Sequence, residues 1–396
     1  MTQRPTCSLD FADPGFAVDP YPHFAQQRAD GPIGWHEASQ TWMVVAHDAC
    51  NAALRTRRLG RIWHDREPVA RYEPFNLLHR NQMMENEPPA HGRLRRQVST
   101  AFARGHVERM RPRVAEIGAE LLADVDPNGF DALSDFAEPL PVLVIAELLG
   151  APLEDFARLR NWSQAIVRMY EPSIGPDVED AALRASQEFA DYMRELIAER
   201  RDDLRDDLLS DLIRAQEGDD GLTDDEALAS AILLLNAGHE ASVNVFGNGL
   251  VATLTSPAEW RRLCDGSVTP VTAVEEMLRF DSALQLFERT ATADVDVAGQ
   301  SVVTGEKIAV LLGSANRDAA VFDEPDRLDL ARDPNPHIAF GAGVHFCLGA
   351  PLARVELAES LSLLARTFPS LRLAGEPERR PTFVLRGFES VPVSAA

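Results

Sequence analysis

Lysine is almost absent from this chain of 396 residues: Lys307 is the only one, so arginine carries nearly all of the positive charge. Lysine and arginine together number 39, against 62 aspartates and glutamates, which gives a formal net charge of −23. Because such an acidic surface repels phosphate backbones, the composition argues against a general nucleic-acid-binding protein. A local basic patch is still compatible with it.

Cysteine is also scarce, and its spacing excludes two common roles. The four cysteines, Cys7, Cys50, Cys264 and Cys347, lie far apart and form no CxxC pair. Disulfide frameworks and structural zinc sites are recognised by several cysteines at characteristic spacings. We therefore expect neither, and each cysteine has to be interpreted from its own neighbours.

Long apolar runs are missing too. The most apolar segment, residues 140–149, is interrupted by Pro141 and Glu147, and no stretch approaches the length that spans a bilayer. The N-terminal residues lack the basic-then-apolar run of a signal peptide. No linker or repeat divides the chain. We expect a cytoplasmic protein with no membrane segment, folded as a single domain over residues 1–396.

The apolar pattern predicts a mainly α-helical protein with small β-sheets. Apolar residues recur at helical spacing over most of residues 91–280, including 107–123, 140–149 and the charged stretch 177–217. Strand-like alternation is confined to shorter segments: 41–46, 286–312 and the tail 381–393.

Several helix boundaries can be predicted from end signals. Thr223 and Glu226 form a capping-box pattern ahead of a long apolar helix. Asp48 is the predicted N-cap of a short helix, and Leu348 is expected to open the last long helix. Residues 60–90 are rich in Arg, His, Pro and Asn, so we expect them to be irregular; residues 313–346 are expected to be largely irregular too.

The fourth cysteine, Cys347, lies in the sequence FGAGVHFCLG, residues 340–349, together with three glycines. Glycines let a backbone turn sharply and approach a flat ligand closely. The cysteine also precedes a predicted helix start, where free N–H groups and the helix dipole favour a thiolate. A thiolate is the form that binds a metal ion.

This ten-residue segment resembles the haem-binding signature of the cytochrome P450 family. The resemblance implies the mainly α P450 fold, haem b as cofactor and Cys347 as the axial ligand of its iron. It also implies that Phe340 packs beside the thiolate, that His345 contacts a haem propionate, and that Gly341 and Gly349 belong to the cofactor site.

Other motifs of the family follow in the expected order. Glu276 and Arg279 form an ExxR pattern whose spacing puts both side chains on one helix face. The same spacing occurs elsewhere in the chain, but only here does it lie in an apolar helix ahead of the cysteine segment. The resemblance implies that Arg327 completes a Glu-Arg-Arg cluster with this pair.

Further basic residues match the family's propionate-binding positions. His91 and Arg95 are four apart and would project from one face of a helix, and Arg289 matches another propionate-binding arginine. Two carboxylates at the haem edge need fixed cationic or hydrogen-bonding partners.

Around His91 the chain is locally basic, with seven arginines in about twenty residues: Arg93, Arg95, Arg96, Arg104, Arg109, Arg111 and Arg113. The resemblance places this region near the cysteine side of the haem. There the arginines would dock an acidic ferredoxin; they could equally be an ordinary solvated helix face.

The long apolar helix contains the segment Ala-Gly-His-Glu-Ala-Ser, residues 237–242, at the place where the family's helix crosses the haem. Glu240 matches the acid of the family's acid–alcohol pair, but Ala241 stands where most members have threonine. Alanine has no hydroxyl to deliver protons. Our hypothesis is that Glu240, Ser242 and water, with or without a substrate hydroxyl, supply the protons instead.

The resemblance implies a monooxygenase that inserts one oxygen atom of O2 into an organic substrate, by hydroxylation or epoxidation, in polyketide- or macrolide-like secondary metabolism. Electrons would come from NAD(P)H through a ferredoxin reductase and a ferredoxin. Alternatives are oxidative coupling, desaturation or rearrangement, and a non-catalytic haem sensor. The predicted substrate pocket draws on five segments: residues 60–85, 163–175, 234–241, 283–287 and 385–388.

Overall fold

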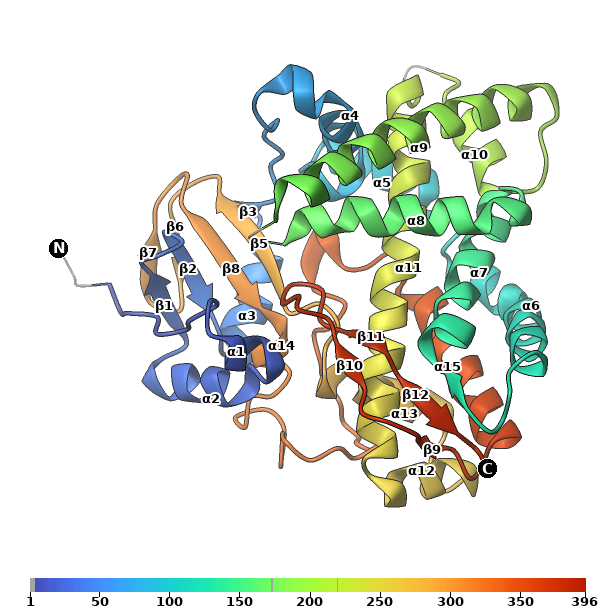
Figure 1. Cartoon of the computed structure of the whole chain (residues 1–396). Coiled ribbons are helices and arrows are strands. Elements are labelled where there is room, and N and C mark those ends of the chain that lie inside the picture. Colours follow the sequence, from blue (N-terminus) through green and yellow to red (C-terminus); the bar gives the residue numbers. More distant parts are fainter. Residues whose placement is uncertain (1–3, 172–173, 219) are drawn as a thin grey trace.

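The structure is a computed structural model that describes residues 4–171, 174–218 and 220–396. Helices make up most of it and short strands form small sheets, as predicted (Figure 1). Residues 1–3 of the N-terminal segment and residues 172–173 of the predicted pocket lie outside the described residues.

The α-helices have these bounds: α1 Pro14–Val18, α2 Tyr21–Asp30, α3 His47–Arg55, α4 Val69–Arg80, α5 Ala90–Ser99, α6 Arg104–Ala123, α7 Pro139–Leu149, α8 Phe156–Val167, α9 Pro176–Asp202, α10 Leu208–Arg214, α11 Asp224–Leu254, α12 Pro257–Cys264, α13 Pro270–Phe280, α14 Leu312–Ala315 and α15 Ala350–Thr367. Shorter 3-10 or π turns are η1 Met83–Glu85, η2 Leu133–Ala137, η3 Leu153–Asp155, η4 Arg168–Tyr170 and η5 Gly343–His345.

The largest sheet has five strands in the order β1-β2-β8-β5-β3, with β8 parallel to β2 and antiparallel to β5. Its strands are β1 Ile33–His36, β2 Thr41–Val44, β3 Leu59–Gly60, β5 Leu286–Ala291 and β8 Lys307–Leu311. The remaining strands form small sheets: β6 Val295–Val297 with β7 Gln300–Val302, β10 Glu378–Arg379 with β11 Phe388–Ser390, and β4 Phe130–Asp131, β12 Pro392–Ser394 and β9 Arg372–Leu373 in that order.

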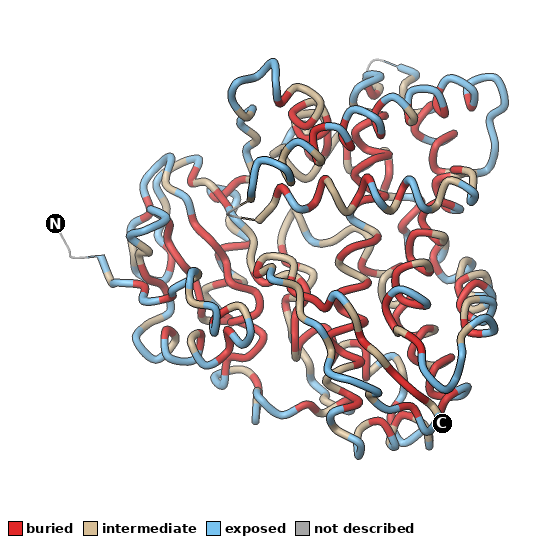
Figure 2. Tube along the Cα trace, in the orientation of Figure 1, coloured by how far each residue is buried: buried red, intermediate tan, exposed pale blue. Residues whose placement is uncertain are grey.

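Helix α11 passes through the middle of the molecule and packs against α7, α8, α9 and α13 (Figure 1). Most of its residues are buried, in agreement with its apolar sequence (Figure 2). A Cβ atom at Gly249 would lie 2.2 Å from the side chain of Met277, so glycine is what lets α13 approach α11 so closely. The predicted capping box of Thr223 and Glu226 is confirmed at the start of this helix.

Three boundary predictions were wrong. Ala46 is the N-cap of α3, and Asp48 lies in the first turn, where its charge still favours the helix dipole. Residues 60–90 are irregular only in part, because α4 accommodates Pro74 in its interior and buries Tyr72, Phe75 and other residues of one face. The last long helix begins at Ala350 rather than at Leu348.

The ExxR prediction is confirmed as a fully buried ion pair. Arg279 donates from Nε and Nη2 to the two carboxylate oxygens of Glu276, at 2.7 and 2.8 Å, and both side chains are 0% exposed. Its remaining N–H groups donate to the carbonyl oxygens of Asn316, Pro325 and Arg327. The pair therefore ties α13 to the long segment between α14 and η5.

The prediction that Arg327 completes this cluster was wrong. The side chain of Arg327 is 60% exposed and pairs with Glu324, at the i,i+3 spacing. The third member is Arg332, whose Nε lies 3.1 Å from Glu276 Oε2. Arg327 contributes only its carbonyl oxygen, which accepts hydrogen bonds from Arg279 and Arg332.

A second buried network fixes the turn between β10 and β11. Asp281 accepts hydrogen bonds from Arg379, Arg386 and Tyr21, and its pKa is lowered to about 2 because these arginines outweigh its burial. At the tip of the turn, Glu171 accepts hydrogen bonds from the backbone N–H groups of residues 383, 384 and 385. The turn is therefore held at its base and at its tip.

Within the described residues, no helix has the combination of length and apolar sequence that crossing a bilayer requires.

Candidate active site

The segment around Cys347 forms a tight loop that ends at the start of α15. The Cys347 N–H donates to the Phe340 carbonyl oxygen at 3.0 Å, which closes the loop. Gly341 and Gly343 both have positive φ, and a Cβ at Gly343 would lie 2.4 Å from the Leu54 carbonyl oxygen. These two glycines are therefore required by the backbone path, which packs the loop against α3.

The sulfur of Cys347 lies where backbone donors converge. The N–H groups of Gly349 and Ala350 donate to it, and the guanidinium groups of Arg95 and Arg354 add positive potential. Burial outweighs these effects and raises the pKa of the Cys347 thiol. Coordination to a metal ion deprotonates such a thiol, and the two N–H groups would then stabilise the thiolate.

Two further predicted residues, Phe340 and Gly349, lie at the ends of this loop. The ring of Phe340 is half-buried, and the Arg354 guanidinium lies 4.6 Å from its centroid. Gly349 is the N-cap of α15 and has an ordinary backbone conformation. A Cβ at Gly349 would meet nothing within 4 Å, so its conformation and protein neighbours do not require glycine there.

The four predicted propionate-binding residues are brought together from three parts of the chain. His91 of α5 and His345 of η5 have ring centroids 4.5 Å apart. Arg95 donates to the Phe346 carbonyl oxygen at 2.8 Å, and Arg289 of β5 is close enough to lower the pKa of His345.

The charge of this cluster is only partly compensated. Burial lowers the pKa of Arg289 to about 9, and among the described residues its side chain bonds only to the Glu288 carbonyl oxygen. Burial, with His345 and Arg95 nearby, lowers the pKa of His91 to about 4. Glu87, which the sequence did not single out, accepts a 2.7 Å hydrogen bond from His345 Nε2. Buried guanidinium groups without counter-ions favour an anionic ligand.

On α11, the predicted catalytic segment presents two different faces. Ala237 is exposed and Gly238, Ala241 and Ser242 are partly exposed, although most of this helix is buried. Glu240 is buried instead, and its Oε2 accepts from Arg380 Nη1 at 3.0 Å. Positions two apart on a helix do not face each other, so Glu240 and Ser242 are not brought into contact.

The predicted substrate segments meet one another. His79 of α4 bonds to the Tyr170 hydroxyl at 3.1 Å, which joins the segments 60–85 and 163–175. Leu284 and Leu385 form an antiparallel bridge, which joins the segments 283–287 and 385–388. Helix α8 packs against α11, which contains the remaining segment, 234–241.

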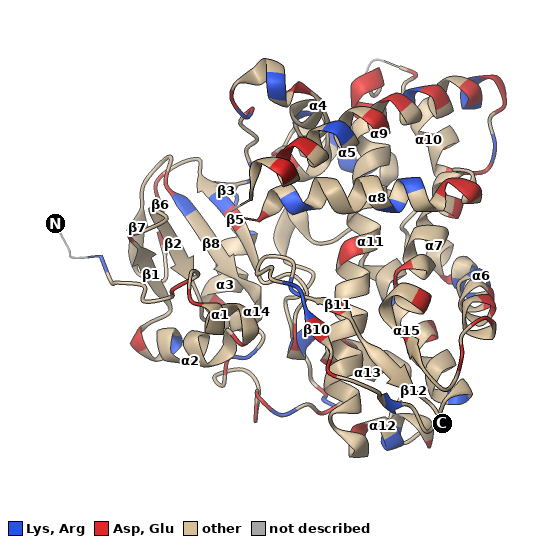
Figure 3. Ribbon diagram, in the orientation of Figure 1, with Lys and Arg blue, Asp and Glu red and all other residues tan. Residues whose placement is uncertain are grey.

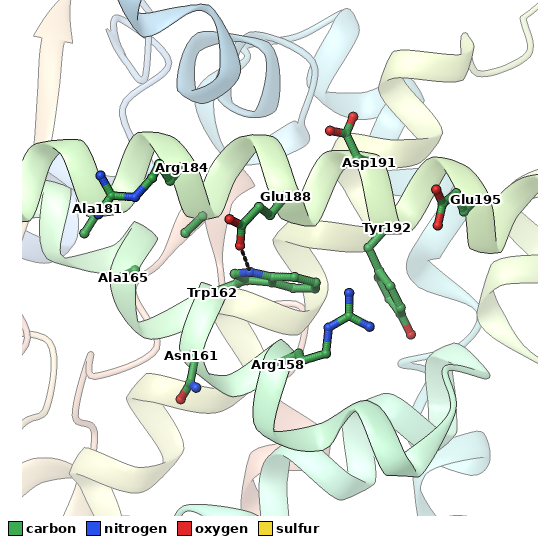
Figure 4. Close-up of a pocket in the computed structure, with 11 residues that line it drawn as sticks. Arg158, Asn161, Trp162, Ala165, Ala181, Arg184, Glu188, Asp191, Tyr192 and Glu195 are labelled. Atoms are coloured by element: carbon green, nitrogen blue, oxygen red, sulfur yellow. Dashed lines mark hydrogen bonds between the residues drawn. The ribbon is translucent and has the colours of Figure 1, made fainter.

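Two surface hollows are lined in part by the predicted substrate segments. One, of about 590 Å³, lies between α8 and α9, where Arg158 packs over the rings of Trp162 and Tyr192 (Figure 4). The other, of about 480 Å³, is lined in part by Arg61, Glu85 and Glu87 and so reaches the carboxylate that binds His345.

Haem fits this set of residues. Haem needs one thiolate ligand and donors for its two propionates. The cysteine loop provides the thiolate, and the neighbouring cationic cluster provides the donors. A mainly helical fold with this donor set defines the class of haem-thiolate proteins.

The comparisons identify the family. The family described as Cytochrome P450 matches residues 271–385. Nocardicin C N-oxygenase of Nocardia uniformis subsp. tsuyamanensis is 40% identical over 96% of both chains. Cytochrome P450 monooxygenase PikC of Streptomyces venezuelae is 37% identical over 98% of this chain and 94% of its own. The chain belongs to the cytochrome P450 family.

A solved structure agrees with this. P450BioI, in complex with acyl carrier protein ligated to hexadec-9Z-enoic acid, aligns with a TM-score of 0.91 and 33% identity over 97% of this chain and all of that one. The chain is thus an oxidoreductase, a P450 monooxygenase that inserts one oxygen atom of O2 into an organic substrate. Membership of the family implies haem as the cofactor and a redox partner that supplies electrons.

Proposed function

We propose that the chain binds haem b through Cys347 and hydroxylates or epoxidises a polyketide- or macrolide-like secondary metabolite. The observation that carries the binding site is the pair of N–H groups at the Cys347 sulfur, since a thiolate ligand is tuned by such donors. Relatives named for nocardicin C and 6-deoxyerythronolide B support secondary metabolism as the context. The single domain over residues 1–396 and the cytoplasmic location stay predictions.

In this proposal, each residue of the cationic cluster has a role toward the cofactor. Arg95, Arg289, His91 and His345 hold the two propionates, while Phe340 packs beside the sulfur and Gly341 and Gly349 keep the haem face free of side chains. Bound haem supplies the iron that activates dioxygen. The segments that meet around Leu385 would position the substrate.

Oxygen labelling tests the reaction type. A substrate is first identified by the shift of the haem Soret band on binding, and turnover is then run under labelled O2. We expect one labelled oxygen atom in the product, because monooxygenation transfers one atom of O2. A product without label would favour coupling, desaturation or rearrangement. One specific observation supports bond formation without oxygen insertion as a second candidate function. CxnD, a P450 enzyme for C–S bond formation in chuangxinmycin biosynthesis, aligns with a TM-score of 0.86 at 32% identity.

Proton delivery is proposed to start from Glu240, since Ala241 has no hydroxyl. Burial raises the pKa of Glu240, and its Oε1 has no hydrogen-bond partner in the described residues, so this oxygen is free to exchange a proton with water. Ser242, on the accessible face, and a substrate hydroxyl would continue the path.

Glu240→Gln is expected to lower the rate of product formation by about 10²-fold or more, the usual contribution of a general acid. The measurement is product formed per NAD(P)H consumed, with Ala241→Thr as the companion variant. Threonine restores the hydroxyl that most family members have, so we expect it to keep or improve this ratio. An unchanged rate and ratio in Glu240→Gln would contradict the role of the acid.

The electron donor is proposed to be a ferredoxin, reduced by NAD(P)H through a ferredoxin reductase. Of the seven arginines around α5 and α6, four have partners in other elements or in carboxylates: Arg93, Arg95, Arg111 and Arg113. The other three, Arg96, Arg104 and Arg109, are exposed and form no ion pair with the described residues. Arg109 bonds only within its own helix, to the Gly105 carbonyl oxygen and to His106. Phe346, next to the cysteine, is 40% exposed. Figure 3 shows that α6 carries both basic and acidic residues.

Charge reversal tests this docking surface. Arg104→Glu with Arg109→Glu is expected to raise the KM for a reduced acidic ferredoxin by at least about tenfold at low salt, because the attraction that speeds encounter is lost. Arg184→Glu is the matched control: Arg184 is an exposed arginine of α9, away from the cysteine loop. Equal effects of the two changes would contradict the assignment, as would a KM that does not depend on ionic strength in the native protein.

A further inference from the structure

Glu240 stands at the inner end of a row of ionisable side chains that runs to the surface. Its Oε2 lies 3.0 Å from Arg380 Nη1, and Arg380 Nε lies 3.2 Å from Glu389 Oε2. The exposed fraction of the side chains rises along this row, from 6% for Glu240 to 16% for Arg380 and 65% for Glu389. A buried acid is thus two contacts away from solvent.

A branch of the same row reaches α7 and α8. Arg380 Nη2 lies 3.5 Å from Glu138 Oε1, and Glu138 Oε2 accepts from Arg160 Nη1 at 3.2 Å. Arg380 therefore faces three carboxylates, those of Glu138, Glu240 and Glu389. It is the one guanidinium of the described residues that bridges them, and it follows directly after β10 in the chain.

Buried polar atoms without partners lie on α11 within about one turn of Glu240, and another lies on α8. Both ring nitrogens of His239 are unpaired although the residue is fully buried, and its Nδ1 lies 3.7 Å from Glu240 Oε1. Asn236 Oδ1, both amide atoms of Asn244 and Ser163 Oγ are also unpaired within the described residues. Buried polar atoms are normally satisfied by protein groups or by ordered water, so this part of α11 is suited to hold water.

We propose that Arg380 is a positioning residue for proton delivery, which holds the Glu240 carboxylate at the inner end of a hydrated path that opens to solvent at Glu389. The inference rests on the proposed role of Glu240. Protons move through water along the carboxylates, and the ion pair with Arg380 fixes which oxygen of Glu240 faces that water. The Glu240 oxygen that has no hydrogen-bond partner among the described residues is Oε1, which is also the oxygen nearest to His239 Nδ1.

The charges that set the ionisation of Glu240 come from several elements. Burial raises its pKa; Arg380 and Arg160 oppose this, whereas Glu389 raises it further. His239, its neighbour, is kept neutral because burial lowers its pKa to about 3. Glu138 is a further carboxylate of the row, and Glu240 contributes to raising its pKa. Removing Arg380 takes away the strongest of the interactions that favour the carboxylate form of Glu240.

The test uses Arg380→Met and Arg380→Lys in the haem-loaded protein. An opposite charge at this distance lowers a carboxyl pKa by about 1–3 pH units, so Arg380→Met should shift the titration of Glu240 upward by that amount. The carboxylic acid C=O band in the infrared difference spectrum reports it directly. In the double variant Arg380→Met with Glu240→Gln, the band of Glu240 should be absent, and its loss relative to Arg380→Met assigns that band to Glu240. Lysine at position 380 should restore most of the native titration.

Turnover should separate a positioning role from a structural one. With Arg380→Met we expect an unchanged substrate KM, a kcat about tenfold lower, and a pH profile displaced in the same direction as the infrared titration, while Arg380→Lys recovers kcat. Arg372→Met is the control, since Arg372 is an exposed arginine of the nearby strand β9. Soret and far-ultraviolet spectra verify folding of each variant.

The outcomes are distinguishable. If Arg380→Met leaves the Glu240 titration and the pH profile unchanged while Glu240→Gln still impairs turnover, Arg380 has no positioning role and Glu240 keeps its own. Equal losses in Arg380→Met and Arg380→Lys, with a changed KM, would also overturn the proposal, since they indicate a structural role. Loss of any effect of Glu240→Gln would instead remove the proposed function of Glu240 on which this inference rests.

Discussion

Cys347→Ala is expected to abolish the thiolate-type band in the carbon monoxide difference spectrum of the reduced protein, and with it all substrate turnover. The reason is that Cys347 is the cysteine whose sulfur receives two backbone N–H donors beside a cationic cluster, and the thiolate is what promotes O–O cleavage. The measurement is the difference spectrum, taken after haem content has been determined, so that loss of haem and loss of the thiolate are told apart.

Cys264→Ala provides the matched control for this experiment. Cys264 is also half-buried, but its sulfur lies near a carbonyl oxygen, that of Pro369, rather than near N–H donors. We expect the band and the turnover to persist in this variant. A native spectrum in Cys347→Ala would refute the assignment of the axial ligand, whatever the activity.

Arg279→Met is expected to reduce the free energy of unfolding by about 3–5 kcal/mol, because it leaves the carboxylate of Glu276 buried with only part of its charge compensated. Both side chains of this pair are 0% exposed, and Arg279 also satisfies three carbonyl oxygens. Urea unfolding followed by circular dichroism, at a fixed haem content, measures the loss. Arg332→Met should have a smaller effect, since Arg332 contacts the Glu276 carboxylate through Nε alone and its side chain is partly open to solvent, at 10% exposed.

Arg327→Met is the control that separates the two arginines. Its side chain is 60% exposed and pairs with a carboxylate that is 68% exposed, and such surface pairs contribute about 0–1 kcal/mol. A loss in Arg327→Met as large as that in Arg279→Met would mean that the cluster has the membership predicted from the sequence instead of the one in the structure.

The parts of the site that the sequence predicted well are those encoded locally. The loop from Phe340 to Gly349 is a contiguous pattern in which positive-φ glycines and a helix start leave little freedom, so Cys347 could be singled out. His91 and Arg95 share one helix face by their spacing alone. The capping box at Thr223 likewise depends on residues three apart. In each case the interacting groups are near neighbours in the chain.

What the sequence could not predict depends on contacts between distant segments. Arg332 and Arg327 lie in the same irregular segment, and nothing in their spacing tells which one reaches Glu276 across more than fifty residues. Glu87 contacts His345 from 258 residues away, and Arg380 contacts Glu240 from 140 residues away. Helix α4 was missed for a different reason: its interior Pro74 and its polar residues masked a buried face.

The carboxylate of Glu171, which binds three backbone N–H groups of the turn between β10 and β11, matters for attempts to change the substrate range of this enzyme. Backbone anchoring of this kind is independent of the side chains at 384 and 385. Randomised libraries at these two positions should therefore vary the shape of the pocket while the main chain stays in place. Substitutions at Glu171 itself would change the shape of the pocket and also release the main chain of the turn. Glu171 is therefore the position to leave unchanged.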